Sequence, residues 1–222
     1  MGASADDDMV PDNAFAADIA GYLEKYVILG KSEALWSFGF NISNIGTKVS
    51  YDGGNTNQFL PTKLSLGTGL LYPLDDYNQI ALYVDLSKYL VPTAPIQTGS
   101  TAEEIEEYNQ KYEDYNNMSP ITGIFKSFSD SPNGFKGELE EIMASIGLEY
   151  NYNEQFFVRG GYYYENKYQG NRQYFSVGAG FRMSVFQLDA AYLISTVQSN
   201  PLDQTLRFSL SFDMDGIRNL FR

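Results

Sequence analysis

The sequence predicts an all-β protein, an antiparallel up-and-down β-barrel of the outer-membrane type with about nine strands. Three features indicate this fold: apolar and polar residues alternate along long segments, tight turns and long loops alternate between them, and aromatic residues end the apolar faces. The alternation is clear where Leu206, Phe208 and Leu210 are separated by polar residues. Because successive side chains of a strand point to opposite faces, each such segment has one apolar and one polar face.

Nine segments show this alternation. The first begins at Asn13 and fits either a short helix or a strand; we favour a strand with Phe15, Ala17 and Ile19 on one face. The other eight predicted strands cover residues 35–43, 62–72, 80–87, 143–152, 156–165, 174–183, 186–195 and 204–214.

The connections between the segments have a periodicity of their own. Tight turns are predicted near residues 73–76, 151–154 and 184–185. Longer polar loops are predicted near residues 44–59, 91–137, 166–170 and 198–203. Short turns at one end and long loops at the other are typical of an outer-membrane barrel. We therefore expect the tight turns and the C-terminus to face the periplasm, and the long loops to be extracellular.

A soluble antiparallel sheet or sandwich also alternates, so the membrane interpretation needs further support. Most of the segments are long enough to span a bilayer when tilted. Their apolar faces also end in aromatic residues, as an interfacial girdle would. These aromatic residues are Trp36, Tyr72, Tyr150, Tyr152, Phe156, Tyr162 and Tyr164. Both features favour the membrane barrel.

The long loop at residues 91–137 is predicted to contain helices. Thr101 and Glu104 have the spacing of a capping box, which indicates that an acidic helix begins here and continues to about Asn117. A second short helix is predicted over residues 121–128. The acidic side chains of the first helix lack the spacing of calcium ligands, so we interpret them as a solvated face.

The composition excludes several classes of function. The chain of 222 residues has no cysteine and no histidine, which excludes disulfides, thiolate metal sites, histidine-based catalysis and most zinc chemistry. The formal net charge of −13 argues against a nucleic-acid partner, because nucleic-acid-binding proteins carry basic patches. No apolar run approaches the roughly 18 residues of a transmembrane helix, a test that does not apply to alternating strands.

Ionisable residues are predicted on the inward, lumen-facing side of the strands. One interpretation is a lumen that grips a peptide terminus or a polar solute; the other is mutual pairing that fills the interior of the barrel. Glycines on the same face either clear space for a ligand or permit strand coiling. The predicted lumen-facing ionisable residues are Asp85, Glu149, Arg159, Glu165, Arg182, Asp189 and Arg207.

Four segments resemble known families. The sequences FGFNISNIGTKVSY at residues 38–51 and LPTKLSLGTGLLY at residues 60–72 look like the FadL-type superfamily of outer-membrane barrels. The segments NAFAADI at residues 13–19 and GIFKSFSDSPNGFKGELEEI at residues 123–142 resemble the PorV (LptO) family of the type IX secretion system. The resemblance spans essentially the whole chain and matches the C-terminal part of that family. We therefore expect residues 1–222 to be the C-terminal portion of a single outer-membrane barrel domain.

The resemblance implies a location, a function and partners. It implies a non-enzymatic shuttle, without catalytic residues, cofactor or metal, in the outer membrane of a Gram-negative bacterium. Such a shuttle contacts outer-membrane lipid and binds the C-terminal signal domain of secreted cargo. It receives the cargo from the translocon Sov and passes it to an attachment complex that contains the sortase PorU. The alternative is a FadL-like channel for uptake of hydrophobic small molecules, which would need an apolar pocket where this sequence places polar residues.

The long loop contains candidate contacts for cargo or for another partner. Its second predicted helix carries Ile121, Ile124, Phe125 and Phe128 at helical spacing. Apolar residues on such a loop need a surface to pack against, and long loops in compact domains are usually functional or disordered. We expect these residues either to contact cargo or the attachment complex, or to pack as a lid over the mouth of the barrel.

Overall fold

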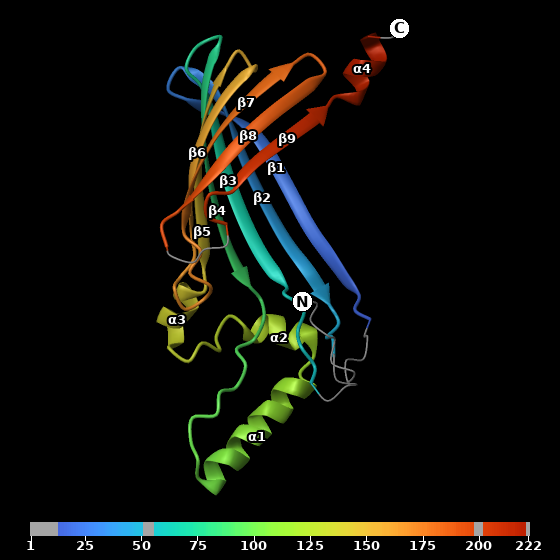
Figure 1. The fold of residues 1–222 in the computed structure, drawn as a ribbon, viewed down its shortest axis with the longest axis vertical. Coiled ribbons are helices and arrows are strands. Elements are labelled where there is room, and N and C mark those ends of the chain that lie inside the picture. Colours follow the sequence, from blue (N-terminus) through green and yellow to red (C-terminus); the bar gives the residue numbers. More distant parts are fainter. Residues whose placement is uncertain (1–12, 51–55, 198–201, 221–222) are drawn as a thin grey trace, which may run out of the picture. The chain divides into compact units, whose positions relative to one another are not determined.

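The computed structural model describes residues 13–50, 56–197 and 202–220. These residues form one nine-stranded sheet in which the strands follow one another in chain order (Figure 1). The strands are β1 (Ala16–Leu29), β2 (Ser32–Gly46), β3 (Lys63–Pro73), β4 (Asn78–Tyr89), β5 (Met143–Tyr152), β6 (Phe156–Tyr164), β7 (Tyr174–Met183), β8 (Phe186–Ser195) and β9 (Leu206–Phe212). The helices are α1 (Ala102–Asn117), α2 (Pro120–Lys126), α3 (Gly134–Glu140) and α4 (Met214–Leu220).

The sheet is an antiparallel meander, as the sequence predicts. Strands β4 and β5 pair directly, from Asn78 opposite Tyr152 to Ser87 opposite Met143, although α1, α2 and α3 lie between them in the chain. The later hairpins close through turns with positive φ, at 53° for Asn153, 54° for Glu154 and 39° for Ser184. Such turns fix the register of each hairpin, and the register determines which side chains share a face.

The two faces of the sheet differ in character. One row of paired residues runs from Glu149 through Arg159, Gly178 and Ala191 to Arg207, so these positions share one face. The neighbouring rows on the other face consist mostly of aliphatic and aromatic residues. One of these rows joins Ile80, Tyr150, Val158, Ala179, Ala190 and Phe208. We call the two sides the polar face and the apolar face.

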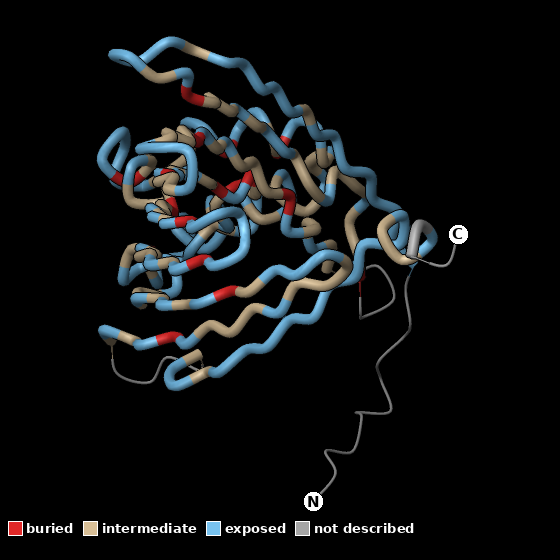
Figure 2. Tube along the Cα trace, turned by 90° about the horizontal axis from the view of Figure 1, so that it is seen from above, coloured by how far each residue is buried: buried red, intermediate tan, exposed pale blue. Residues whose placement is uncertain are grey.

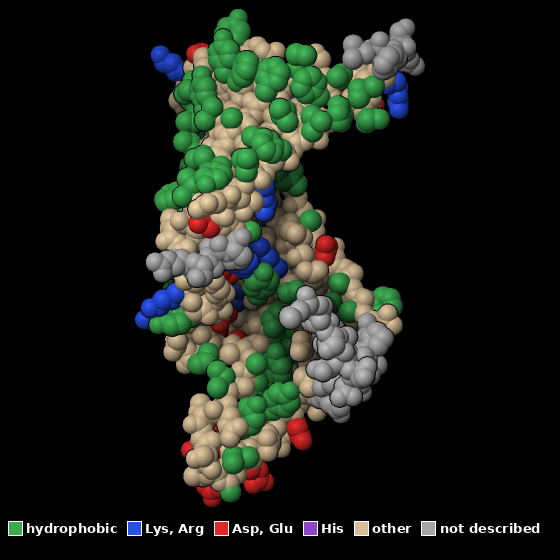
Figure 3. Space-filling model, in the orientation of Figure 1, with side chains coloured by type: hydrophobic (Ala, Val, Ile, Leu, Met, Phe, Trp, Pro, Cys, Tyr) green, Lys and Arg blue, Asp and Glu red, His purple; other side chains and the backbone are tan. Residues whose placement is uncertain are grey.

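Most of the large hydrophobic side chains are exposed. Buried residues are few and scattered along the trace in Figure 2, and the buried hydrophobic ones among the described residues are Ala34, Ala81, Leu90, Met143, Phe157 and Leu193. On the apolar face, by contrast, Val177 is 51% exposed and Phe208 is 70% exposed. Hydrophobic side chains accordingly gather over the strands in the upper part of Figure 3. An exposed apolar surface of this kind marks a face that contacts lipid or another protein.

The chain divides into two compact units. One contains the described residues of Met1–Ala20, Asn41–Leu64 and Lys88–Leu139, and therefore includes α1 and α2. The other contains Gly21–Phe40, Ser65–Ser87 and Glu140–Arg222, and therefore includes all of β5 to β9. None of the helices in the described residues is both long and apolar enough to span a membrane.

The predicted elements are largely confirmed. All nine strands are present, and the bounds of β5, β7 and β8 are those predicted. The segment from Asn13 is a strand, but β1 is longer than predicted because it continues to Leu29. Helices α3 and α4 were not predicted, and β9 ends at Phe212 instead of Met214. The predicted loops at residues 44–59 and 198–203 lie partly outside the described residues.

Candidate functional site

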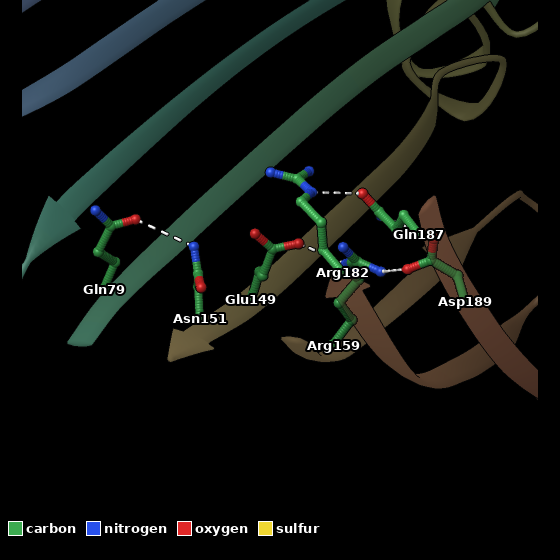
Figure 4. Close-up of polar contacts among 7 residues, drawn as sticks. All are labelled: Gln79, Glu149, Asn151, Arg159, Arg182, Gln187 and Asp189. Atoms are coloured by element: carbon green, nitrogen blue, oxygen red, sulfur yellow. Dashed lines mark hydrogen bonds and ion pairs between the residues drawn. The ribbon is translucent and has the colours of Figure 1, made fainter. Parts of the chain in front are cut away.

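The polar face carries a connected network of charged side chains (Figure 4). Arg159, on β6, lies between two carboxylates on different strands. Its Nε atom donates to Glu149 Oε2 of β5 at 2.5 Å, and its Nη1 atom donates to Asp189 Oδ1 of β8. Gly180 lies on β7 between Arg159 and Asp189, and a Cβ there would collide with the Asp189 carboxylate. Glycine at this position therefore leaves the space that the Arg159–Asp189 ion pair occupies.

Amide side chains extend the network beyond Asp189 and form a separate pair on β4 and β5. Gln187 Nε2 donates to Asp189 Oδ2 at 2.8 Å, and Arg182 Nε donates to Gln187 Oε1 at 2.9 Å. Asn151 Nδ2 donates to Gln79 Oε1 at 3.2 Å on the neighbouring strands (Figure 4). The guanidinium groups of Arg159 and Arg182 both lie over the ring of Phe157, at 4.9 and 5.1 Å from its centroid. The two arginines are thus held by planar contacts as well as by hydrogen bonds.

Glu165, just beyond the end of β6, forms an ion pair outside this network. It is 1% exposed, and both of its carboxylate oxygens accept from Arg172, from Nε at 2.6 Å and from Nη2 at 2.8 Å. The two residues bracket the loop between β6 and β7, which includes Gly170 with a φ of 141°. A Cβ at Gly170 would lie 2.8 Å from Glu165 Oε2. A buried carboxylate requires such a partner, so the ion pair fixes the conformation of this loop.

The structure therefore brings together four of the seven predicted ionisable residues: Glu149, Arg159, Arg182 and Asp189. The other three, Asp85, Glu165 and Arg207, lie apart from this network. Asp85 accepts a hydrogen bond from Ser145 at 3.3 Å, and Arg207 is exposed on β9. All six that lie in strands share the polar face, and the orientation of this face toward a lumen stays a prediction.

Helix α2 presents the four predicted apolar residues of the long loop. It begins after Ser119, whose hydroxyl accepts from Thr122 N at 3.1 Å, and Pro120 occupies its first turn. Gly123 is buried, and a Cβ on it would lie 2.7 Å from the ring of Phe59 and 3.2 Å from Pro92. This packing turns the opposite side of α2 outward.

The outward side of α2 is an exposed apolar stripe. Phe125 is 73% exposed, Ile121 is 55% exposed and Phe128, just after the helix, is 49% exposed. Ile124 is half-buried. Residues 121, 125 and 128 follow the spacing of a single helix face, so they form one surface. We call Ile121, Ile124, Phe125 and Phe128 the α2 apolar stripe.

Residues that sequence analysis did not single out hold the long loop in place. Lys48 Nζ donates to the carbonyl oxygens of Tyr115 at 2.9 Å and Asn116 at 3.1 Å, at the C-terminal end of α1. It also lies 4.0 Å from the centroid of the Phe59 ring. Burial lowers the pKa of Lys48. An ammonium group at the C-terminus of a helix satisfies carbonyls that lack a partner within the helix.

Another ion pair anchors α3. Lys88 Nζ donates to Glu138 Oε2 at 2.7 Å, and Glu138 Oε1 accepts from Ser131 N at 2.9 Å. Burial raises the pKa of Glu138, but the hydrogen bonds from Lys88 and from Ser131 outweigh it and hold that pKa below its usual value. Neither Lys88 nor Arg172 lies in a sequence pattern that indicates its carboxylate partner. Within the described residues, no group of three acidic side chains is arranged to hold a metal ion.

Comparison with known families agrees with the resemblance seen in the sequence. The sequence model of the PorV family, described as "Type IX secretion system protein PorV", matches residues 2–96. The predicted resemblance to the PorV family is thus confirmed over this range, which includes the segment at residues 13–19. The segment at residues 123–142 lies outside it. No curated protein matches the chain.

Proposed function

We propose that this PorV-type protein is a non-enzymatic outer-membrane component of the type IX secretion system that binds secreted cargo. In this proposal it recognises the folded C-terminal signal domain of cargo delivered by the translocon Sov. It then passes the cargo to the attachment complex that contains the sortase PorU. The observation that carries the proposal is the match of residues 2–96 to a family of type IX secretion proteins.

The distribution of polar and apolar side chains supports an outer-membrane location. The apolar face exposes residues such as Phe175 and Val177, each 51% exposed, while the polar face carries the Glu149–Arg159–Asp189 ion pairs. A barrel in a bilayer needs this arrangement, because lipid solvates the apolar face and the polar face lines the interior. The polar network also disfavours the uptake of hydrophobic molecules, since an apolar ligand beside it would strip water from charged groups.

The α2 apolar stripe is the proposed contact surface for cargo or for the attachment complex. Exposed apolar residues on a well-anchored helix are a common feature of protein–protein contacts. The close packing of Gly123 against Phe59 and Pro92, together with the fully buried Ser127 at the end of α2, keeps the stripe in place before a partner arrives. Little conformational entropy would then be lost on binding.

Replacing Phe125 and Phe128 together by serine in the full-length protein tests this role. We expect cargo to accumulate in the periplasm, or unprocessed on the barrel, while barrel abundance and heat-modifiable gel mobility stay unchanged. The matched control is Tyr77→Ser, because Tyr77 is 59% exposed and lies in the tight turn after β3. Normal secretion by the double variant would contradict a binding role, and loss of the barrel would indicate that the stripe serves packing.

A further inference from the structure

A hollow on the polar face of β4 to β7 is built by glycines. The register places Tyr83, Gly147, Gly161 and Ser176 side by side on these four strands. Because two adjacent positions in this row have no side chain, the polar face is hollowed there into a cavity of about 370 Å³. We call it the tyrosine cavity.

Tyrosine rings form the walls of this cavity. Tyr163 and Tyr174 line it, and their rings stack with a centroid separation of 5.1 Å and an interplanar angle of 16°. Tyr83 lines it from β4 and is 41% exposed. The face of an aromatic ring carries partial negative charge and attracts cations within about 6 Å of its centroid.

The carboxylates of the cavity differ in their pairing. Glu149 lines it and is already paired with Arg159. Asp85 also lines it and accepts the 3.3 Å hydrogen bond from Ser145, but among the described residues it has no ion-pair partner. Glu165 and Asp189, elsewhere in the same unit, each pair with an arginine. Asp85 is therefore an exposed carboxylate in a tyrosine-lined cavity, and no cation pairs with it in the part of the chain that the structure describes.

The tyrosine rings and the Asp85 carboxylate together favour a cationic ligand. An anionic ligand would need Arg159, whose guanidinium is already engaged by Glu149 and Asp189. A neutral apolar ligand would cover Asp85 without replacing the water lost from its carboxylate, which is unfavourable. A cation would contact the tyrosine rings and pair with Asp85, so it satisfies both.

We propose that the tyrosine cavity binds an ammonium or guanidinium group, presented by a lysine or arginine side chain of a peptide. This deepens the proposed function, because a cargo signal domain would supply such a side chain. The site itself depends only on the geometry of β4 to β7. A free diamine offers the same chemistry, so the two sources are compared directly.

The experiment uses the full chain purified in detergent and isothermal titration calorimetry. The probes are a capped tripeptide with a central lysine, the same tripeptide with norleucine in place of lysine, and free cadaverine. We expect the lysine peptide to bind at least about tenfold more tightly than the norleucine peptide, a difference of about 1.4 kcal/mol. Equal affinity for the two peptides would overturn the proposal. Tighter binding of cadaverine than of the lysine peptide would assign the site to small amines and overturn the peptide source.

Two variants locate the binding. Asp85→Asn keeps the size of the side chain and an acceptor for Ser145, and should weaken lysine-peptide binding about tenfold or more. Asp76→Asn removes the same charge from an exposed turn and should leave binding unchanged. Gly147→Val should also abolish binding by filling the cavity, since a Cβ there lies 3.9 Å from its nearest neighbour, Tyr83 Cβ, and causes no clash. Wild-type affinity in Asp85→Asn would overturn the proposal.

This test is independent of secretion. The calorimetry uses no translocon, cargo or sortase, so failure of the cargo-shuttle proposal does not affect it. Conversely, secretion by Asp85→Asn cells at the wild-type rate, with peptide binding lost in calorimetry, would overturn the connection to cargo while supporting the cation site.

Discussion

Two adjacent alanines in the middle of β8 allow the environments of the two faces to be compared directly. Ala190 lies on the apolar face between Ala179 of β7 and Phe208 of β9, whereas Ala191 lies on the polar face between Gly178 and Arg207. Replacing each by arginine introduces the same side chain at nearly the same depth. The free energy of unfolding of the two variants then reports what each face contacts.

The expected penalties differ several-fold. If lipid covers the apolar face, arginine at 190 lies near the middle of the bilayer and should destabilise the barrel by about 2–4 kcal/mol. At position 191 the opposite residue Gly178 has no side chain, so the new side chain has room. Its main cost is repulsion from Arg207, and such like-charged pairs between strands cost about 0.2–1 kcal/mol. We therefore expect Ala190→Arg to be less stable than Ala191→Arg by about 2 kcal/mol.

Reversible urea unfolding of the full-length barrel in lipid vesicles measures this difference. A gap of about 2 kcal/mol corresponds to roughly a 30-fold change in the unfolding equilibrium constant, which is well within reach of the method. Equal penalties would refute the assignment and indicate a soluble sandwich with both faces packed. A negligible penalty at 190 would indicate that the apolar face contacts water.

Two further predictions concern the turns and the long loop. The chain contains no cysteine, so an introduced thiol can be labelled selectively. The thiol of Glu106→Cys on α1 should react with an impermeant maleimide on intact cells, whereas the thiol of Asp76→Cys in the turn after β3 should not. The opposite pattern would invert the predicted topology. Hydrogen bonds from the Thr101 hydroxyl at 2.7 Å and the Thr101 N–H at 2.9 Å hold the pKa of Glu104 below its usual value. The capping box should therefore stabilise the first turn of α1 fully above about pH 4.3 and lose this effect as the pH falls through the lowered pKa. Amide hydrogen exchange of residues 105–107 should show this loss, and Glu104→Gln, which cannot titrate, should show exchange protection independent of that transition.

Strands were predictable because their signal is local. The alternation in residues 174–183 and 186–195 involves neighbouring residues only, and the turn at Ser184 ends both segments, so these bounds follow from the sequence. Helix α1 was predictable for a similar reason, because Thr101 and Glu104 form the capping box that their spacing indicates. The signals that predicted these elements therefore involve residues within or next to each element.

The missed helices depend on contacts that no local pattern shows. Helix α3 lies at the end of the predicted long loop, and its Glu138 pairs with Lys88, fifty residues earlier in the chain. Helix α4 begins after Asp213, whose carboxylate accepts from Asp215 N at 3.0 Å. That aspartate was a usable capping signal. It was overlooked because the apolar alternation of β9 continues to Met214.

For the candidate site, too, the sequence predicted the local features and missed those that depend on distant contacts. Alternation assigns Glu149, Arg159 and Asp189 to one face, but only the register of four consecutive strands determines that the arginine lies between the two carboxylates. That register depends on the tight turns, where one residue more or less would move each side chain to the opposite face. The sequence therefore predicts that charged residues share a face, and the structure is needed to show which of them pair.

The pairing also bears on the question that the sequence left open, whether these charges recognise a ligand or satisfy one another. Arg159, Glu149 and Asp189 satisfy one another, and Glu165 and Arg172 do the same, so these residues serve the stability of the strands and the adjoining loop. Two positions on this face differ: Asp85 faces a cavity floored by glycines, and Arg207 lies exposed on β9. A charged side chain that only fills the interior is expected to be paired. A residue that binds a charged ligand must instead remain exposed with its charge available. We therefore expect Asp85 and the tyrosines around it, and not the network around Arg159, to bind a ligand on the polar face.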